Sequence, residues 1–123
     1  MRNTDRICEN IGVNSEGVLL FAGQSVKALA EQYGTPLFLM DEDRIRNRMQ
    51  TYANGMKAAF GEYGHVLYAS KAASFKRIYE LAAAEGIGVD VVSAGEIATA
   101  YRAGFPLEKA CFHSYNKTDA DIR

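Results

Sequence analysis

Apolar runs of strand length alternate with helix-like segments through most of this chain, and this alternation restricts the fold more than any other feature. The apolar runs centre near residues 38, 68, 90 and 112. Strand–helix–strand units join into a parallel sheet through right-handed crossovers. The later runs follow one another about every 22 residues, which suits βα units with short loops. The pattern predicts an α/β fold, the N-terminal half of a (β/α)8 barrel that takes about 250 residues when complete.

Capping and turn residues set the expected bounds of these elements. Short polar side chains accept hydrogen bonds from first-turn amides, so Ser25, Asp41 and Ser74 are expected to begin helices. The expected helices cover residues 26–33, 42–60, 75–84 and 95–103, and another begins at 118 or 119. The expected strands cover residues 36–40, 65–70, 89–92 and 110–113. The apolar stripe of the third helix consists of Ile78, Leu81 and Ala82.

The first 25 residues lie outside this rhythm. Residues 17–23 form an apolar run between two glycines and are expected to be a strand without an obvious partner. We therefore expect two parts, an N-terminal β segment at residues 1–25 and four βα units at residues 26–123. The last expected helix has barely begun where the sequence ends, so we expect the chain to be part of a longer protein.

Charge and cysteine content exclude several classes of function. The net charge is −1 and no basic run occurs, which argues against nucleic acid or an anionic membrane surface as partner. No apolar stretch approaches the roughly 20 residues of a membrane span. The two cysteines, Cys8 and Cys111, lie far apart and belong to no Cys/His cluster, so no metal site is expected. They fit a reducing compartment, which predicts a cytoplasmic protein, and Cys111 is expected to be buried in its strand.

A single lysine, Lys71, ends the apolar run at residues 66–69. Alternate residues of a strand share a face, so Lys71 is expected to point the same way as Leu67 and Ala69. Desolvation beside apolar side chains favours the neutral amine, which is the form that condenses with an aldehyde. The residues alone leave a second interpretation open, a surface lysine at a strand end.

Two acidic residues follow on the next βα unit. Asp90 stands inside the apolar run at residues 87–92, where a carboxylate is costly unless it is paired. Because neighbouring parallel strands end at the same edge of a sheet, Asp90 can approach Lys71; the alternative is a strand-end or helix-capping aspartate. Glu96 reads as a first-turn acid that complements a helix dipole. His113, at the end of the next strand, is expected to be structural.

Four segments, in order, resemble the fold-type III pyridoxal-phosphate decarboxylases. They are residues 33–41 (Tyr-Gly-Thr-Pro-Leu-Phe-Leu-Met-Asp), 68–72 (Tyr-Ala-Ser-Lys-Ala), 88–96 (Gly-Val-Asp-Val-Val-Ser-Ala-Gly-Glu), and 103–106 with 112–118 (Ala-Gly-Phe-Pro and Phe-His-Ser-Tyr-Asn-Lys-Thr). Within that family they are most similar to the diaminopimelate decarboxylases. The resemblance covers roughly residues 33–123.

The resemblance implies a cofactor and roles for three residues. Lys71 would be catalytic and would hold pyridoxal 5'-phosphate covalently. Asp90 would lie beside it as a catalytic and cofactor-binding residue, and Glu96 would bind the cofactor from the periphery of the site. The N-terminal segment, residues 1–25, would join a separate β-sandwich domain built mostly from later sequence. The family also implies an amino-acid substrate and a homodimer.

The implied activity is that of a carboxy-lyase of lysine biosynthesis, which converts meso-2,6-diaminopimelate to L-lysine as part of a longer enzyme. Related decarboxylases of arginine, ornithine or carboxynorspermidine stay open as alternatives, because specificity residues would lie mainly beyond Arg123. A different class also stays open, a non-catalytic protein that binds pyridoxal phosphate or an inactive fragment. The isolated 123-residue chain is expected to be inactive.

Overall fold

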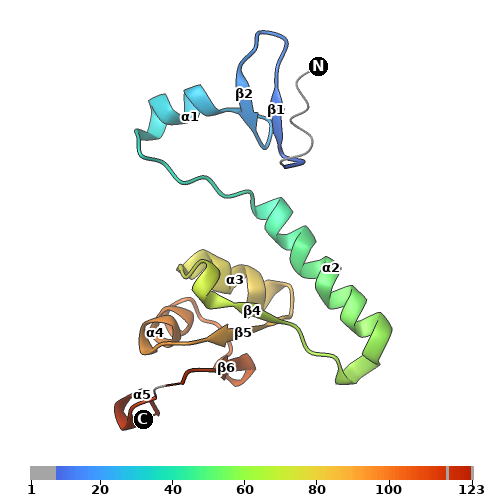
Figure 1. Ribbon diagram of the computed structural model, residues 1–123, viewed down its shortest axis with the longest axis vertical. Coiled ribbons are helices and arrows are strands. Elements are labelled where there is room, and N and C mark those ends of the chain that lie inside the picture. The colour runs from blue at the N-terminus through green and yellow to red at the C-terminus, as the bar shows by residue number, and fades with distance from the viewer. Residues whose placement is uncertain (1–7, 116, 123) are drawn as a thin grey trace. The chain divides into compact units, whose positions relative to one another are not determined.

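The computed structural model describes residues 8–115 and 117–122 (Figure 1). The chain divides into two compact units, Met1–Ile45 and Arg46–Arg123. Residues 1–7 of the predicted N-terminal segment lie outside the described residues, and so does Asn116 of the last resembling segment.

The first unit contains a small antiparallel sheet in the order β1-β2-β3. Its strands are β1 (Ile11–Val13), β2 (Leu19–Phe21) and β3 (Gln24–Ser25). The expectation that residues 17–23 lack a partner is therefore wrong, because β2 pairs on both sides. The chain reverses where the Asn14 side chain accepts hydrogen bonds from the amides of Glu16 and Val18, a turn that asparagine favours.

Helix α1 (Val26–Tyr33) follows β3 and has the predicted bounds. The hydroxyl of Ser25 accepts a hydrogen bond from the Ala28 amide at 3.2 Å. At the other end Gly34 has φ 82°, and its amide donates to Ala30 at 2.9 Å. The strand predicted at residues 36–40 is not observed, since within the described part of the chain this segment has no sheet partner to complete its backbone hydrogen bonds.

The long helix α2 (Glu42–Phe60) begins as predicted, because Asp41 accepts a hydrogen bond from the Arg44 amide at 3.1 Å. The other oxygen of Asp41 accepts from the Asn10 side chain at 2.8 Å, which connects the helix start to the segment before β1. Farther along, Arg46 and Gln50 each donate to Glu85, at 2.7 and 2.8 Å. These bonds, from Gln50 first and then Arg46, lower the pKa of Glu85.

The second unit is built on a parallel sheet in the order β4-β5-β6. Its strands are β4 (Leu67–Ala69), β5 (Gly88–Val91) and β6 (Ala110–Phe112). Its helices are α3 (Lys76–Ala84), α4 (Ala94–Arg102) and α5 (Asp119–Ile122), and short 3-10 turns η2 (Gly61–Tyr63), η3 (Ser70–Ala72) and η4 (Leu107–Lys109) lie between elements. Figure 1 shows this strand–helix alternation from yellow-green to red. The predicted βα rhythm is thus observed from β4 onward.

One face of this sheet is packed against helices. Val89 and Val91 of β5 are fully buried, together with the predicted stripe of α3, which is Ile78, Leu81 and Ala82. Tyr79 of α3 is also buried and meets the Phe105 ring edge-on, with 6.3 Å between ring centroids.

The expected cap at Ser74 is not observed, because its hydroxyl bonds the Tyr79 hydroxyl at 2.9 Å and α3 begins at Lys76.

The other face of the sheet is open. The register pairs Ala69 with Asp90 and Asp90 with Cys111, so these three side chains share this face. Leu67, two residues before Ala69, is 45% exposed. Cys111 is exposed as well, so its predicted burial is wrong, because the helices cover the other face of the sheet.

Candidate functional site

The predicted site residues lie at the carboxyl ends of two neighbouring strands. Lys71 follows β4 within the turn η3, and Asp90 is the third residue of β5. The register places Asp90 opposite Ala69, two residues before Lys71. In (β/α)8 barrels the active site lies at the carboxyl ends of the strands. The sheet therefore brings Lys71 and Asp90 to the same edge.

The turn η3 changes the expected setting of Lys71. Strand β4 ends at Ala69, so the alternation that placed Lys71 on an apolar strand face does not reach it. Lys71 is exposed, whereas its neighbour Ser70 is fully buried. The predicted shielding by Leu67 and Ala69 is not observed, because Lys71 lies exposed in a turn whose first residue, Ser70, is buried. An exposed amine at a strand end is open to a ligand.

Asp90 has an unsatisfied oxygen. Its Oδ1 atom is buried and has no hydrogen-bond partner among the residues that the structure describes. Such atoms are rare in folded proteins, because desolvation of a carboxylate oxygen costs free energy that a donor normally offsets. An ammonium group or a protonated ring nitrogen at this edge would supply that donor. A buried acceptor and an exposed amine at the ends of neighbouring strands therefore fit a ligand that carries both an aldehyde and a positively charged nitrogen, as pyridoxal phosphate does.

Glu96 fixes the loop between β5 and α4. Its Oε2 atom accepts a hydrogen bond from the Val92 amide at 2.8 Å, and its own amide donates to the Ser93 hydroxyl at 3.3 Å. This reciprocal arrangement resembles a capping box and satisfies amides at the start of α4. The first-turn interpretation of Glu96 thus describes its contacts, and its role in binding the cofactor stays a prediction.

The segment after β6 lies next to the end of β5. The His113 amide donates to the Val91 carbonyl at 2.9 Å, which extends the pairing of β5 with β6. The exposed His113 ring lies 5.9 Å from the Tyr115 ring, and the Lys117 amine lies 5.3 Å from the centre of the Phe112 ring. The second contact is a cation–π interaction. The structural role expected for His113 stays a prediction.

Sequence reasoning missed a feature of the turn itself. The Tyr68 hydroxyl donates a hydrogen bond to the Ala73 carbonyl at 3.0 Å, across the residues of η3. Burial raises the pKa of Tyr68. The signal was available, because Tyr68 alternates onto the helix-covered face opposite Val89, where a buried tyrosine hydroxyl needs a partner.

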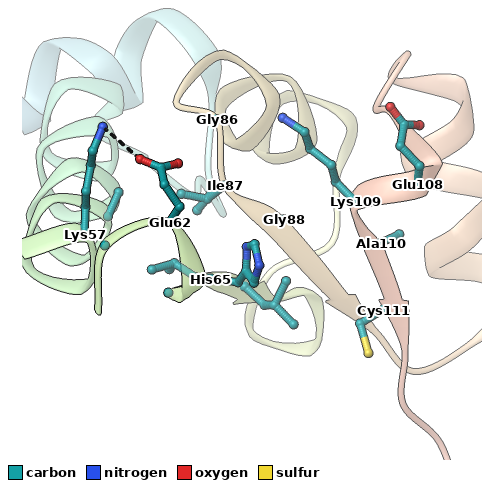
Figure 2. A pocket seen from close by; sticks show the side chains of 15 residues that line it. Lys57, Glu62, His65, Gly86, Ile87, Gly88, Glu108, Lys109, Ala110 and Cys111 are labelled. Carbon is teal, nitrogen blue, oxygen red and sulfur yellow. Dashed lines mark ion pairs between the residues drawn. The ribbon is translucent and has the colours of Figure 1, made fainter. Parts of the chain in front are cut away.

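A hollow of about 680 Å³ lies at the opposite edge of the sheet, where the strands begin. Figure 2 shows Lys57, Glu62 and His65 on one side of it and Glu108 and Lys109 on the other. Lys57 and Glu62 form a loose ion pair of 3.9 Å. The hollow does not include Lys71 or Asp90, so this concavity and the predicted chemistry lie at different ends of the strands.

In the described part of the chain, no group of three or more His, Cys, Asp or Glu side chains could hold a metal ion. None of its helices combines the length and the apolar character that crossing a membrane requires.

Comparison with known proteins gives a consistent result. The family model described as "Pyridoxal-dependent decarboxylase, pyridoxal binding domain" matches residues 42–123. The chain is 45% identical to a diaminopimelate decarboxylase of Bacillus methanolicus and 43% identical to that of Bacillus subtilis, in each case over 89% of this chain and 25% of the relative. It therefore spans about a quarter of the length of the curated relatives that it matches.

Solved structures of decarboxylases also resemble this chain. The diaminopimelate decarboxylase from M. jannaschii in complex with L-lysine superimposes with a TM-score of 0.78 and 32% identity, covering 93% of this chain and 27% of that one. The lysine/ornithine decarboxylase from Vibrio vulnificus complexed with putrescine gives a TM-score of 0.68 and 26% identity, covering 91% and 28%.

Proposed function

The chain belongs to the pyridoxal-dependent decarboxylases, and from this premise we propose that it forms the N-terminal half of the active-site barrel of a diaminopimelate decarboxylase. The enzyme would convert meso-2,6-diaminopimelate to L-lysine with release of carbon dioxide. The observation that carries the proposal is that the exposed Lys71 and the unsatisfied oxygen of Asp90 lie at the carboxyl ends of neighbouring strands of a parallel sheet. Curated diaminopimelate decarboxylases at 43–45% identity support this substrate.

In this proposal the strands β4, β5 and β6 belong to the first half of a (β/α)8 barrel. The open face of the sheet, with Ala69, Asp90 and Cys111, would line the barrel interior. Later sequence would cover that face and supply the remaining strands. Residues 1–25 would belong to a second β domain, for which the antiparallel strands β1, β2 and β3 provide the first part. The complete enzyme would be a cytoplasmic homodimer.

The chemistry divides between the cofactor and the residues of this chain. Pyridoxal phosphate supplies an electron sink for the electron pair that carbon retains when carbon dioxide leaves. The Nζ atom of Lys71 would hold the cofactor covalently. The Oδ1 atom of Asp90 would accept a hydrogen bond from a protonated nitrogen at this edge and would so stabilise its positive charge. Glu96 keeps the loop after β5 in place through the Val92 amide.

The alternative with independent support is a related amino-acid decarboxylase. The lysine/ornithine decarboxylase of Vibrio vulnificus has the same local fold, with a TM-score of 0.68. Its identity to this chain is 26%, compared with 32% for the solved diaminopimelate decarboxylase, so the latter is favoured. Carbon dioxide release by the complete enzyme from meso-diaminopimelate, ornithine, lysine and arginine distinguishes these substrates.

Covalent labelling tests the central residue. We expect borohydride reduction of the complete enzyme, followed by peptide mapping, to place the pyridoxyl group on Lys71. Lys71→Arg should abolish the label and the activity, whereas the matched control Lys76→Arg, at the exposed start of α3, should keep both. A label on Lys76 or Lys117 would refute the assignment. Cofactor absorbance without carbon dioxide release from any of these amino acids would instead favour a non-catalytic binding protein.

A further inference from the structure

The turn that carries Lys71 is closed by a tyrosine from the strand before it. Tyr68, in β4, donates its hydroxyl hydrogen bond to the Ala73 carbonyl at 3.0 Å. Ala73 is the first residue after η3 and has an extended backbone. The bond thus joins the two ends of the turn, and Lys71 lies at its centre. A change at either end of this bond would alter the direction in which the turn presents Lys71.

The surroundings of Tyr68 make this bond durable. Tyr68 lies opposite Val89, which is fully buried on the helix-covered face of the sheet. Burial raises the pKa of Tyr68, so the hydroxyl keeps its proton and remains a donor at neutral and mildly alkaline pH. Ser70, inside the turn, is itself fully buried. The turn therefore begins at a buried residue, Ser70, and is bridged by the Tyr68 hydroxyl, while Lys71 stays exposed.

We propose that Tyr68 is a positioning residue, whose hydroxyl fixes the turn η3 and thereby directs the amine of Lys71 toward the cofactor. This inference rests on the proposed function, because it assumes that Lys71 holds the cofactor. Reaction rates depend steeply on placement, and a displacement of about 1 Å can cost about 100-fold. A hydrogen bond that restricts the turn would therefore affect the reaction of Lys71 more than it affects global stability.

The chain offers a matched control in Tyr79. Its hydroxyl is also engaged in one hydrogen bond with a neighbouring group, the Ser74 hydroxyl at 2.9 Å, and its side chain is fully buried. That bond joins α3 to the segment before it and does not span Lys71. Tyr68→Phe and Tyr79→Phe remove the same atom from a half-buried and a buried tyrosine, so a purely structural role predicts an effect of Tyr68→Phe no larger than that of Tyr79→Phe.

The test uses the complete enzyme, loaded with pyridoxal phosphate. We expect Tyr68→Phe to slow the appearance of borohydride-fixed label on Lys71 and to weaken cofactor retention by roughly fivefold to tenfold, in line with the loss of one hydrogen bond. The pH midpoint of the visible absorbance of the bound cofactor should also move. Tyr79→Phe should lower the thermal midpoint. It should leave the labelling rate within about twofold of wild type and the pH midpoint unchanged.

Two outcomes overturn the inference. One is a Tyr68→Phe enzyme with the labelling rate and the pH midpoint of the wild type. The other is a loss of cofactor retention in both variants that is proportional to the fall in their thermal midpoints. If wild-type Lys71 takes no label at all, the proposed function fails instead. Should Tyr68→Phe not fold, 4-aminophenylalanine and 4-methylphenylalanine at position 68 provide a pair of similar size. The first keeps a donor and should label as wild type does, and equal labelling by both would refute the proposal.

Discussion

Replacing Gly88 by alanine should destabilise the sheet at the start of β5. A Cβ atom at this position would lie 2.5 Å from Cδ2 of Leu67 and 2.6 Å from the carbonyl oxygen of Lys109. Leu67 is 45% exposed and can rotate away. The Lys109 carbonyl belongs to the backbone just before β6, so it can withdraw only if the strand start moves. The Gly88 amide meanwhile donates to the Val66 carbonyl at 3.0 Å, which opposes a movement of β5 itself.

The size of the effect follows from two opposing terms. Forcing an extra carbon into a packed region typically costs about 1–3 kcal/mol. The lower backbone entropy of the unfolded chain returns about 0.4–1 kcal/mol when glycine becomes alanine. We therefore expect Gly88→Ala to lower the free energy of unfolding by roughly 1–2 kcal/mol. Gly55, inside α2, is the matched control, because a Cβ there meets nothing within 4 Å. Gly55→Ala should raise stability by up to about 1 kcal/mol.

Urea unfolding of the complete enzyme, followed by circular dichroism, measures both variants. The midpoint should fall for Gly88→Ala and rise for Gly55→Ala, with unchanged slopes. The reasoning is refuted if Gly88→Ala stays within about 0.5 kcal/mol of wild type, which is the usual range of a neutral surface change. A shift in the same direction as Gly55→Ala would refute it as well.

Two further predictions concern the start of α2 and the isolated chain. Hydrogen bonds from Asn10 and from the Arg44 amide lower the pKa of Asp41 below its ordinary value of 3.8, so its contribution to stability is complete above that pH and is lost as the pH falls through the lowered pKa. Asp41→Ala should therefore lower the thermal midpoint at neutral pH and have a smaller effect in strong acid; an equal effect at both would contradict this. Residues 1–123 alone should release no carbon dioxide from meso-diaminopimelate with added cofactor and should self-associate, because the sheet has an open face and unpaired edges. Turnover, or a cooperative unfolding transition of a monomer, would show that the prediction is wrong.

Local signals in the sequence predicted the helices well. Ser25 and Asp41 both accept the first-turn hydrogen bonds expected of them, and Gly34 ends α1 with a positive φ. The stripe of α3 is buried where helical spacing placed it. Each of these features depends on residues three or four positions apart, so a short window of sequence contains the information that decides them.

Several errors concern contacts that a short window does not contain, whereas the Ser74 cap and the Asn14 turn are local features that were misjudged. Residues 36–40 have the composition of a strand, but a strand also needs a neighbour, and the described residues give them none. Cys111 is exposed because the helices cover the other face of the sheet, which alternation within β6 cannot reveal. The face of Lys71 was predicted by extending the alternation of a strand that ends two residues earlier, at Ala69. The partner of β2 was missed because the Asn14 turn that creates it was overlooked.

The antiparallel strands at the start of the chain have a consequence for how the protein is made. Ile11 pairs with Phe21, and Leu20 pairs with Ser25, so every contact of this sheet closes within about fifteen residues. The parallel pair of Tyr68 and Val89 has to wait for an entire helix to be synthesised. Ribosomes add about 5–20 residues per second, whereas a hairpin forms in about 1–10 μs. The first strands, supported by α1, can therefore adopt their pairing while the ribosome is still adding the segment that contains Lys71, and aggregation-prone parallel edges emerge only behind an N-terminus that has already begun to fold.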